Sequence, residues 1–467
     1  MNKGMKYIYC ALLLCGLAIQ GFSQTLGGAT AGGASSGGGA TVGGAAGGST
    51  SGGEAQATVL TLDSAIAQAV ANRTSIGQAE DEVLAAQAAV GVAQSGYYPK
   101  VNATGNYMRV EPNQSFTFPG LGTFSLSQED NWDFHVGLSQ IVYDFGKRDL
   151  QVKLAESEVG SGRISLDQVK EDLAFKAAQT FYSALFLQEE LASLDGQLAD
   201  LNGHLSVIQK KEETGSATKY DVLSTQVQVA TLQGQRIQAA SQYRKAQIAL
   251  AQLVGLDPSS EVVVNGSLAS NQDSGDVSAF IAQALADRPD LRQASVAQDA
   301  AQLNLDLAKT GGLPTLVAQA EAGYKNGLLP DESSLTFNWA AGLTVNVPLF
   351  NGLLAARQID EARARLDAAK EKGATLRRSV VTQVLQALQD LSASHQAEET
   401  SRVQLDQAQQ ALDAAKIQYE LGVITNDEYL SSQTALAQAK LANLLARYNE
   451  VASDYSLKEA IAQRIWQ

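Results

Sequence analysis

The distribution of proline constrains this chain more than any other feature of its sequence. The eight prolines lie at positions 99, 112, 119, 258, 289, 314, 330 and 348, so residues 149–211 and 353–420 contain none. Because proline disrupts the interior of a helix, both spans are free to form uninterrupted helices. As single helices they would be about 95 Å and about 100 Å long, well beyond the helices of ordinary globular domains.

Apolar residues in the second half follow the spacing of coiled coils. Steps of three and four residues alternate along two series: Leu405, Ala408, Leu412, Ala415 and Tyr419, and Leu430, Thr434, Ala437, Leu441, Leu444, Tyr448, Val451 and Tyr455. Such a seam predicts helices that pack against neighbours along their whole length.

One short phrase occurs twice, each time between two predicted helices. Residues 214–223 read TGSATKYDVL and residues 421–430 read LGVITNDEYL, and four matching residues recur 207 positions apart. Each copy supplies a glycine suited to end a helix, a threonine suited to cap the next one, and an acid at the capping-box spacing: Gly215, Thr218 and Asp221, then Gly422, Thr425 and Glu428. The phrase therefore predicts a tight turn between antiparallel helices, and alone it indicates nothing more.

Four stretches between the helices alternate apolar and polar residues, namely 101–110, 132–139, 315–325 and 335–347. This pattern is typical of membrane β-barrel strands with the apolar side outward, although half-buried strands of a soluble sandwich also show it. Hairpins inserted between such long helices, in an exported chain, favour the barrel. The residues expected to face lipid include Trp132, Phe134, Phe337 and Trp339.

Four strands cannot close a barrel, and an open edge in lipid would leave backbone groups unpaired. The chain must therefore share its sheet with copies of itself. Because an eight-stranded barrel is filled by its own side chains, a conducting pore favours three or more copies.

The N-terminus has the features of a secretion signal, with two lysines before an apolar run and small residues near position 23. The run is too short to span a membrane. Cys10 and Cys15, the only cysteines, lie within it, and each follows a large residue, which disfavours a lipoprotein signal. We expect a signal peptide at 1–23 and a flexible Gly-rich leader at 24–57. Two repeats should follow, at 58–256 and 277–463, joined by a linker at 257–276.

Composition argues against two other classes of function. The formal net charge is −15, and nucleic-acid binding requires a basic surface. His135, His204 and His395 are far apart in the sequence and lack the spacing of a metal or nucleophile site. No phosphate-binding loop is present. We therefore expect no enzyme, no cofactor and no metal.

Several motifs, weak alone, become specific through their order. They are YYPK at 97–100, RPDL at 288–291, VPLFNG at 347–352 and the two turn phrases. From about residue 58 onward the chain resembles the TolC-type outer-membrane efflux proteins. That resemblance implies an α+β membrane protein: a homotrimer whose twelve-stranded β-barrel in the outer membrane continues into a long periplasmic tunnel of helices.

The resemblance also implies partners and roles. The chain would be a passive exit duct of a tripartite efflux or type I secretion system, with an inner-membrane pump and a periplasmic adaptor protein. Adaptor docking would involve Gly215, Thr218, Gly422 and Thr425 at the periplasmic tips. Acids of the entrance gate would be Asp221, Asp427 and Glu428, with Ser431 where a further Asp is often found. The alternative, a periplasmic coiled-coil structural protein without a channel, leaves the alternating strands unexplained. The cargo is not indicated.

Overall fold

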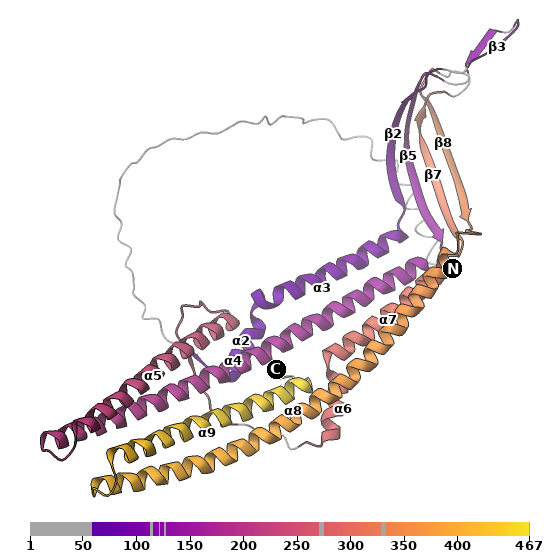
Figure 1. Ribbon diagram of the computed structural model, residues 1–467. Helices are drawn as coiled ribbons and strands as arrows, with labels where there is room; N and C mark the ends of the chain where they lie inside the picture. The colour runs from indigo at the N-terminus through magenta and orange to yellow at the C-terminus, as the bar shows by residue number, and fades with distance from the viewer. Residues whose placement is uncertain are drawn as a thin grey trace, which may run out of the picture. The chain divides into compact units, whose positions relative to one another are not determined.

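The computed structural model describes residues 58–112, 115–120, 122–125, 128–269, 275–327 and 333–466. The expected signal peptide and the Gly-rich leader lie outside these residues. One order of elements occurs twice: short helix, helix, strand, strand, very long helix, helix (Figure 1). The first copy comprises α2 (Leu62–Ala71), α3 (Arg73–Gln94), β2 (Lys100–Arg109), β5 (Asp130–Tyr143), α4 (Lys147–Glu213) and α5 (Lys219–Val254). The second comprises α6 (Val277–Asp287), α7 (Pro289–Thr310), β7 (Thr315–Lys325), β8 (Thr336–Asn346), α8 (Leu354–Glu420) and α9 (Asn426–Ala460).

The two proline-free spans form helices of 67 residues each, α4 and α8. The prediction is correct to within two residues at every end. Leu353, expected to be the first helical residue of α8, instead has a φ of 68° and lies just outside it. At about 1.5 Å per residue each helix is about 100 Å long. Each begins just after a strand and ends at a turn, so the sheet and the turns lie at opposite ends of these helices (Figure 1).

The predicted seam is correct along α8 and wrong at two positions of α9. On α8, Ala415 is buried and the other four seam residues are half-buried, while nearly all of their neighbours are exposed. On α9, Thr434 and Leu441 are exposed. Both line a groove whose walls come mainly from α4, α5 and α9, and no described helix fills that groove.

The four long strands form one antiparallel sheet in the order β2-β5-β7-β8. All four predicted strands are therefore present, and the sheet combines both repeats through the pairing of β5 with β7. Within the described residues, β2 and β8 each pair along one side only. The sheet thus has two free edges and is not closed within one chain.

Two short strand pairings were not predicted. The loop between β2 and β5 contains a small hairpin of β3 (Ser115–Phe118) and β4 (Gly122–Ser125). The segment expected to be a linker contains β6 (Val262–Val264), which pairs in parallel with β1 (Thr58–Leu60). Side chains of β1 and β6 pack in a buried cluster with Phe181 of α4. None of the described helices is both long and apolar enough to cross a membrane.

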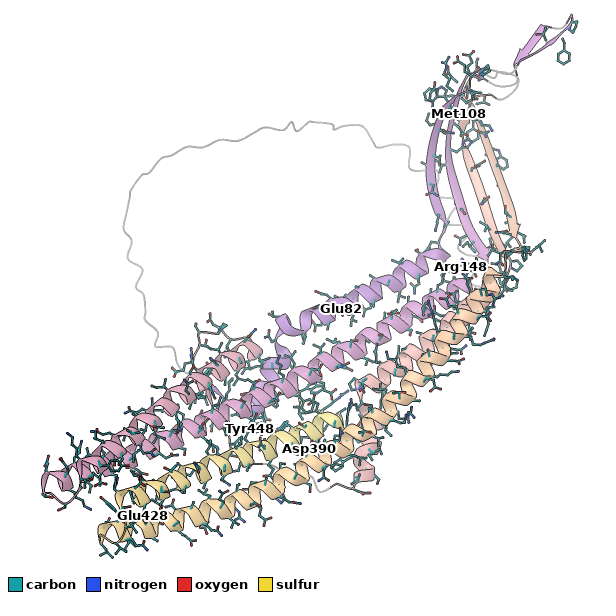
Figure 2. All side chains as sticks on the ribbon, viewed as in Figure 1. Glu82, Met108, Arg148, Asp390, Glu428 and Tyr448 are labelled. Atoms are coloured by element: carbon teal, nitrogen blue, oxygen red, sulfur yellow. The ribbon has the colours of Figure 1, made fainter. Side chains whose placement is uncertain are left out.

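A buried ion pair fixes the sheet to the start of α4. Arg148 and Asp144 are 9% and 7% exposed, and Arg148 Nε donates to Asp144 Oδ2 over 2.8 Å. Arg148 Nη1 donates to the carbonyl oxygens of Gly96 and Ile141, at 3.1 and 2.9 Å. Its guanidinium lies 4.8 Å from the centre of the Tyr97 ring. Arg148, labelled in Figure 2, therefore links β5, α4 and the segment before β2.

Candidate functional site

One face of the four-stranded sheet is apolar and open to its surroundings. In register across β5, β7 and β8 lie Phe134, Tyr324 and Phe337, and the rings of Tyr324 and Phe337 are 5.5 Å apart. Trp132 lies on the same face, 6.0 Å from Phe134 between ring centres. Trp339 is 71% exposed. Soluble monomers rarely leave such a large contiguous apolar patch uncovered, so this face is suited to contact lipid or another protein.

The opposite face of the sheet is polar and less exposed along β5. His135 forms a short contact with Asp133, and its Nε2 lies 3.1 Å from Asn338 Oδ1 on β8. Gly323 of β7 lies between them in register, and a Cβ atom there would be 2.0 Å from the carbonyl oxygen of Phe134. The side chains of β5 and β8 can therefore meet across β7. This alternation confirms the predicted division of the strands into an apolar and a polar side.

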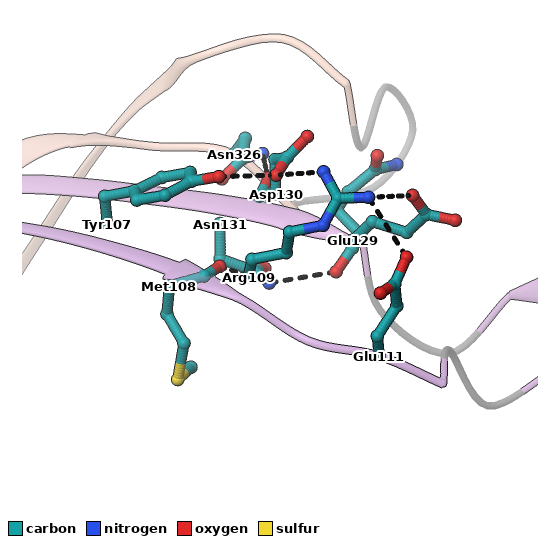
Figure 3. Close-up of polar contacts among 9 residues, drawn as sticks. Tyr107, Met108, Arg109, Glu111, Glu129, Asp130, Asn131 and Asn326 are labelled. Carbon is teal, nitrogen blue, oxygen red and sulfur yellow. Dashed lines mark hydrogen bonds and ion pairs between the residues drawn. The ribbon is translucent and has the colours of Figure 1, made fainter.

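At the end of the sheet farthest from the helices, polar side chains connect three strands (Figure 3). Arg109 of β2 contacts Glu111 at 3.1 Å and both Glu129 and Asp130 at 3.4 Å. Asn326 Nδ2 donates to the carbonyl oxygen of Asp130 over 2.6 Å, which joins β5 to the residue after β7. Because these ion pairs are exposed, each contributes little to stability.

The second candidate site is the pair of turns at the far ends of α4 and α8. Gly215 and Gly422 have φ values of 77° and 72°, as predicted for residues that end a helix. The backbone N–H after each glycine donates to a carbonyl five residues earlier, from Ser216 to Lys211 over 2.7 Å and from Val423 to Gln418 over 2.9 Å. The two turns therefore have the same hydrogen bonds at the end of the helix.

Both turns also begin the next helix with a capping box. Thr218 N donates to Asp221 Oδ2 over 2.8 Å, and Thr425 N donates to Glu428 Oε2, also over 2.8 Å. The threonine hydroxyls accept from the backbone N–H of the same two acids. The hydrogen bonds from the Thr425 backbone and hydroxyl lower the pKa of Glu428, because they stabilise its charged form. Asp221 and Glu428 are thus confirmed as caps of α5 and α9. Glu428 is labelled in Figure 2.

A buried polar cluster beside the turns was not predicted. Asn426, 4% exposed, is the first residue of α9, and its Oδ1 lies 2.8 Å from Nε2 of the buried His204 on α4. Asn426 Nδ2 donates to Thr225 Oγ1 over 3.3 Å. Tyr419 and Tyr429 flank the imidazole, with ring centres 5.4 and 4.3 Å from it. The cluster joins the hairpin of the first repeat to that of the second.

The structure places the predicted residues at the two opposite ends of the long helices. Trp132, Phe134, Phe337 and Trp339 lie together on the sheet. At the turns, Asn426 Nδ2 also lies 3.4 Å from the Asp221 carbonyl oxygen, so the two copies of the phrase meet in space. Asp427 and Glu428 are exposed in the first turn of α9.

Comparison with known proteins decides the family. The family model described as outer membrane efflux protein matches residues 65–256 and 280–463. The chain belongs to the outer membrane efflux protein family. It is 22% identical over 400 residues to the outer membrane efflux protein BepC of Brucella suis biovar 1, covering 86% of this chain and 85% of BepC. It is 24% identical over 336 residues to the outer membrane protein TolC of Escherichia coli, covering 69% of this chain and 68% of TolC.

Solved structures agree with this fold. The CmeC outer membrane channel of Campylobacter jejuni superposes with a TM-score of 0.73 at 15% identity, over 86% of this chain and 85% of CmeC. The predicted fold class is confirmed: long coiled-coil helices are joined to four β-strands per chain, which close only in an oligomer. The chain is an outer-membrane export channel with a periplasmic helical portion, and the alternative of a coiled-coil protein without a channel is set aside. Members of the family are channels, and the absence of an enzymatic activity stays a prediction.

Proposed function

We propose that three copies of this chain form a passive exit duct, in which β8 of one copy pairs with β2 of the next. The free edges of the sheet support this arrangement, because unpaired backbone groups are unfavourable in lipid. Three sheets of four strands give twelve strands, and twelve leave room for a lumen that eight would fill with side chains.

The observation that carries the proposal is the exposed apolar face of the sheet. We assign Trp132, Phe134, Phe337 and Trp339 to the lipid side, and the polar side that contains His135 and Asn338 to the lumen. In a soluble sheet the apolar face would be the covered one. Here Phe337 is 55% exposed, and the polar-face residues of β5 are the less exposed ones.

Two arginine substitutions at adjacent positions test this assignment. In Phe337→Arg the charge faces lipid, where it costs about 2–4 kcal/mol near the middle of the bilayer and less toward its surface. Asn338→Arg places the same charge in the lumen and serves as the matched control. We expect Phe337→Arg to reduce the heat-modifiable trimer in outer-membrane fractions much more than Asn338→Arg. Equal assembly of both variants would contradict the assignment of the faces.

At the other end, we propose that the turns form the periplasmic entrance and dock an adaptor protein. The docking residues are Gly215, Thr218, Gly422 and Thr425, which hold the shape of the two tips. An inner-membrane pump supplies the energy. Site-specific cross-linkers placed at Ser216 and Val423 should capture the adaptor, whereas one at Glu156, an exposed residue near the sheet end of α4, should not. Capture only from Glu156 would contradict the docking site.

We further propose that Asp221, Asp427 and Glu428 line the entrance and favour cations. In a trimer the double variant Asp221→Asn/Glu428→Gln removes two charges from each of three copies, six in all. If these charges lie within about 8 Å of one another they act together at physiological salt. We expect weaker cation preference and weaker block by divalent cations in planar-bilayer recordings. Unchanged selectivity in an assembled pore would show that the acids only cap their helices.

A further inference from the structure

A cavity of about 430 Å³ lies between α4, α7, α8 and α9, away from both the sheet and the turns. Among the described residues, its lining contains five carboxylates and one guanidinium, so acidic side chains predominate. The carboxylates are Glu171, Asp172, Asp290, Asp390 and Glu459, and the guanidinium is that of Arg288. Asp390, labelled in Figure 2, marks the position of the cavity along α8.

Among the described residues, Arg288 is the one basic side chain that lines this cavity, and it already has partners. Arg288 Nη2 contacts Asp290 Oδ2 at 2.7 Å, and Arg288 Nε donates to Asp290 Oδ1 over 3.1 Å. Arg288 Nη1 donates to the carbonyl oxygen of Ala460 over 3.2 Å. Asp290 is therefore the ion-pair partner of Arg288, and the other four carboxylates of the described lining form no ion pair.

Glu171 stands out among these four. It is only 9% exposed and lines the cavity, yet it makes no hydrogen bond and no ion pair with any residue that the structure describes. Burial removes much of the hydration of this carboxylate and no described protein group replaces it, which is unfavourable for its charged form. A bound cation would replace part of the hydration that Glu171 has lost.

The charges around Glu171 come from every helix of the cavity. Burial is the main cause that raises its pKa to about 7, and the charges of Asp172 on α4 and Glu459 on α9 raise it further. Arg292 on α7 and Arg288 oppose the increase. Asp390 on α8 faces the same cavity. Burial also raises the pKa of Asp172 and Glu459. A bound cation would stabilise the charged form of all three carboxylates.

We propose that this cavity binds a small organic cation with primary ammonium groups, of the diamine or polyamine class. Among the residues described, no group of three or more His, Cys, Asp or Glu is placed to hold a metal ion, so the carboxylates do not converge on one point. An ammonium group donates three hydrogen bonds without a fixed coordination geometry, and a chain with two or three such groups can reach separate carboxylates. Gln168, Gln383 and Ser456 add neutral acceptors to the lining.

Binding should be linked to protons. A bound ammonium favours the charged form of Glu171, whose pKa lies at about 7 in the unliganded protein. Cation binding near neutral pH therefore displaces a proton, and the affinity should rise from pH 6 to pH 8. An exposed acidic surface would show no such proton release in this range.

The test is calorimetry on the full-length purified protein with spermidine, in two buffers that differ in ionisation enthalpy. We expect saturable binding and proton release at pH 7. Glu171→Gln should weaken binding about tenfold or more, as for the loss of a hydrogen bond to a charged group, and abolish the proton release. Glu156→Gln, an exposed acid on the same helix, is the matched control and should bind as the unchanged protein does.

Three results would overturn the proposal. One is the absence of saturable heat with spermidine, and another is equal binding by Glu171→Gln. The third is binding of Mg²⁺ as tight as that of spermidine, since this would identify a general acidic surface. None of these results depends on adaptor docking or on the orientation of the sheet.

Discussion

The two turns at the helix ends share a backbone and differ in what surrounds it. In both, a glycine with positive φ ends the long helix and a threonine caps the next one. Yet the second turn carries Asn426, which is 4% exposed, where the first carries the exposed Lys219, 207 positions earlier. Tyr419 and Tyr429, which flank His204, correspond at the same spacing to Glu212 and Val222.

The two copies of the turn therefore differ in their contacts with the other hairpin. The repeated residues are those that fix the turn, and the residues that vary are those that attach one hairpin to the other. The first hairpin offers His204 and Thr225 as receiving groups, and the second brings Asn426 to them. A chain built from two copies thereby gains an asymmetric contact beside the two turns.

The largest effect is expected from removing that contact. Asn426→Leu keeps the size of the side chain but leaves the buried His204 without its hydrogen-bond partner. Thr225 loses the amide that donates to it and keeps its own bond to the Asp221 carbonyl oxygen. A buried polar group left unsatisfied costs about 1–3 kcal/mol. Hydrogen exchange at the start of α9 should accelerate. Lys219→Leu, at the equivalent exposed position, should leave the start of α5 unchanged. If both variants lose the same protection, the proposed asymmetry between the turns is wrong.

Replacing either glycine by valine should destabilise its turn by a smaller amount, and by the same amount in both turns. A non-glycine residue in the left-handed region costs about 1–2 kcal/mol, and valine is especially unfavourable there. Because no atom lies within 4 Å of a Cβ built at Gly215 or Gly422, the penalty in each comes from the backbone alone. Gly215→Val and Gly422→Val should therefore accelerate exchange in their own turns to the same degree. If valine leaves the exchange rates of either turn unchanged, the positive φ at that position does not require glycine.

The caps should give a still smaller difference. Thr218→Ala and Thr425→Ala each remove the hydroxyl that accepts from the third residue of the helix, at a cost of about 1 kcal/mol. The serine variants keep the hydroxyl and should restore most of the loss. Exchange rates in the first turns of α5 and α9 measure the effect. If an alanine variant leaves the exchange rates of its helix unchanged, tertiary contacts alone stabilise that helix end.

What could be predicted from the sequence follows from the range of each interaction. The turns were predictable because Thr218 and Asp221 are three residues apart and interact through the local backbone. The strands were predictable from their period of two. The contact of His204 with Asn426 joins residues 222 apart, and a lone histidine within a helix carries no signal of its partner. The exposure of Leu441 was missed because spacing identifies a seam but not whether another helix covers it.

The smallest effect concerns pH, and it depends on the same asymmetric contact. Burial lowers the pKa of His204, the hydrogen bond with Asn426 acts in the opposite direction, and the charge of Lys211 lowers it again. An unfolded histidine titrates near a pKa of about 6.5. Since the folded value is lower, the unfolded state takes up the proton first as the pH falls. The contribution of His204 to the free energy of local opening is therefore largest above about pH 6.5, and it declines as the pH falls below that value.

We expect amides at the start of α9 to exchange faster at pH 5 than at pH 7.5, after correction for the intrinsic rate. Amides at the start of α5 that are remote from His204 provide the internal comparison. His204→Gln keeps a donor for Asn426 but does not titrate, so its corrected rates should be the same at both pH values. Glu428 is present in both proteins, so the difference between their pH dependences reports His204. If His204→Gln retains the full pH dependence, another group controls the attachment of the two hairpins.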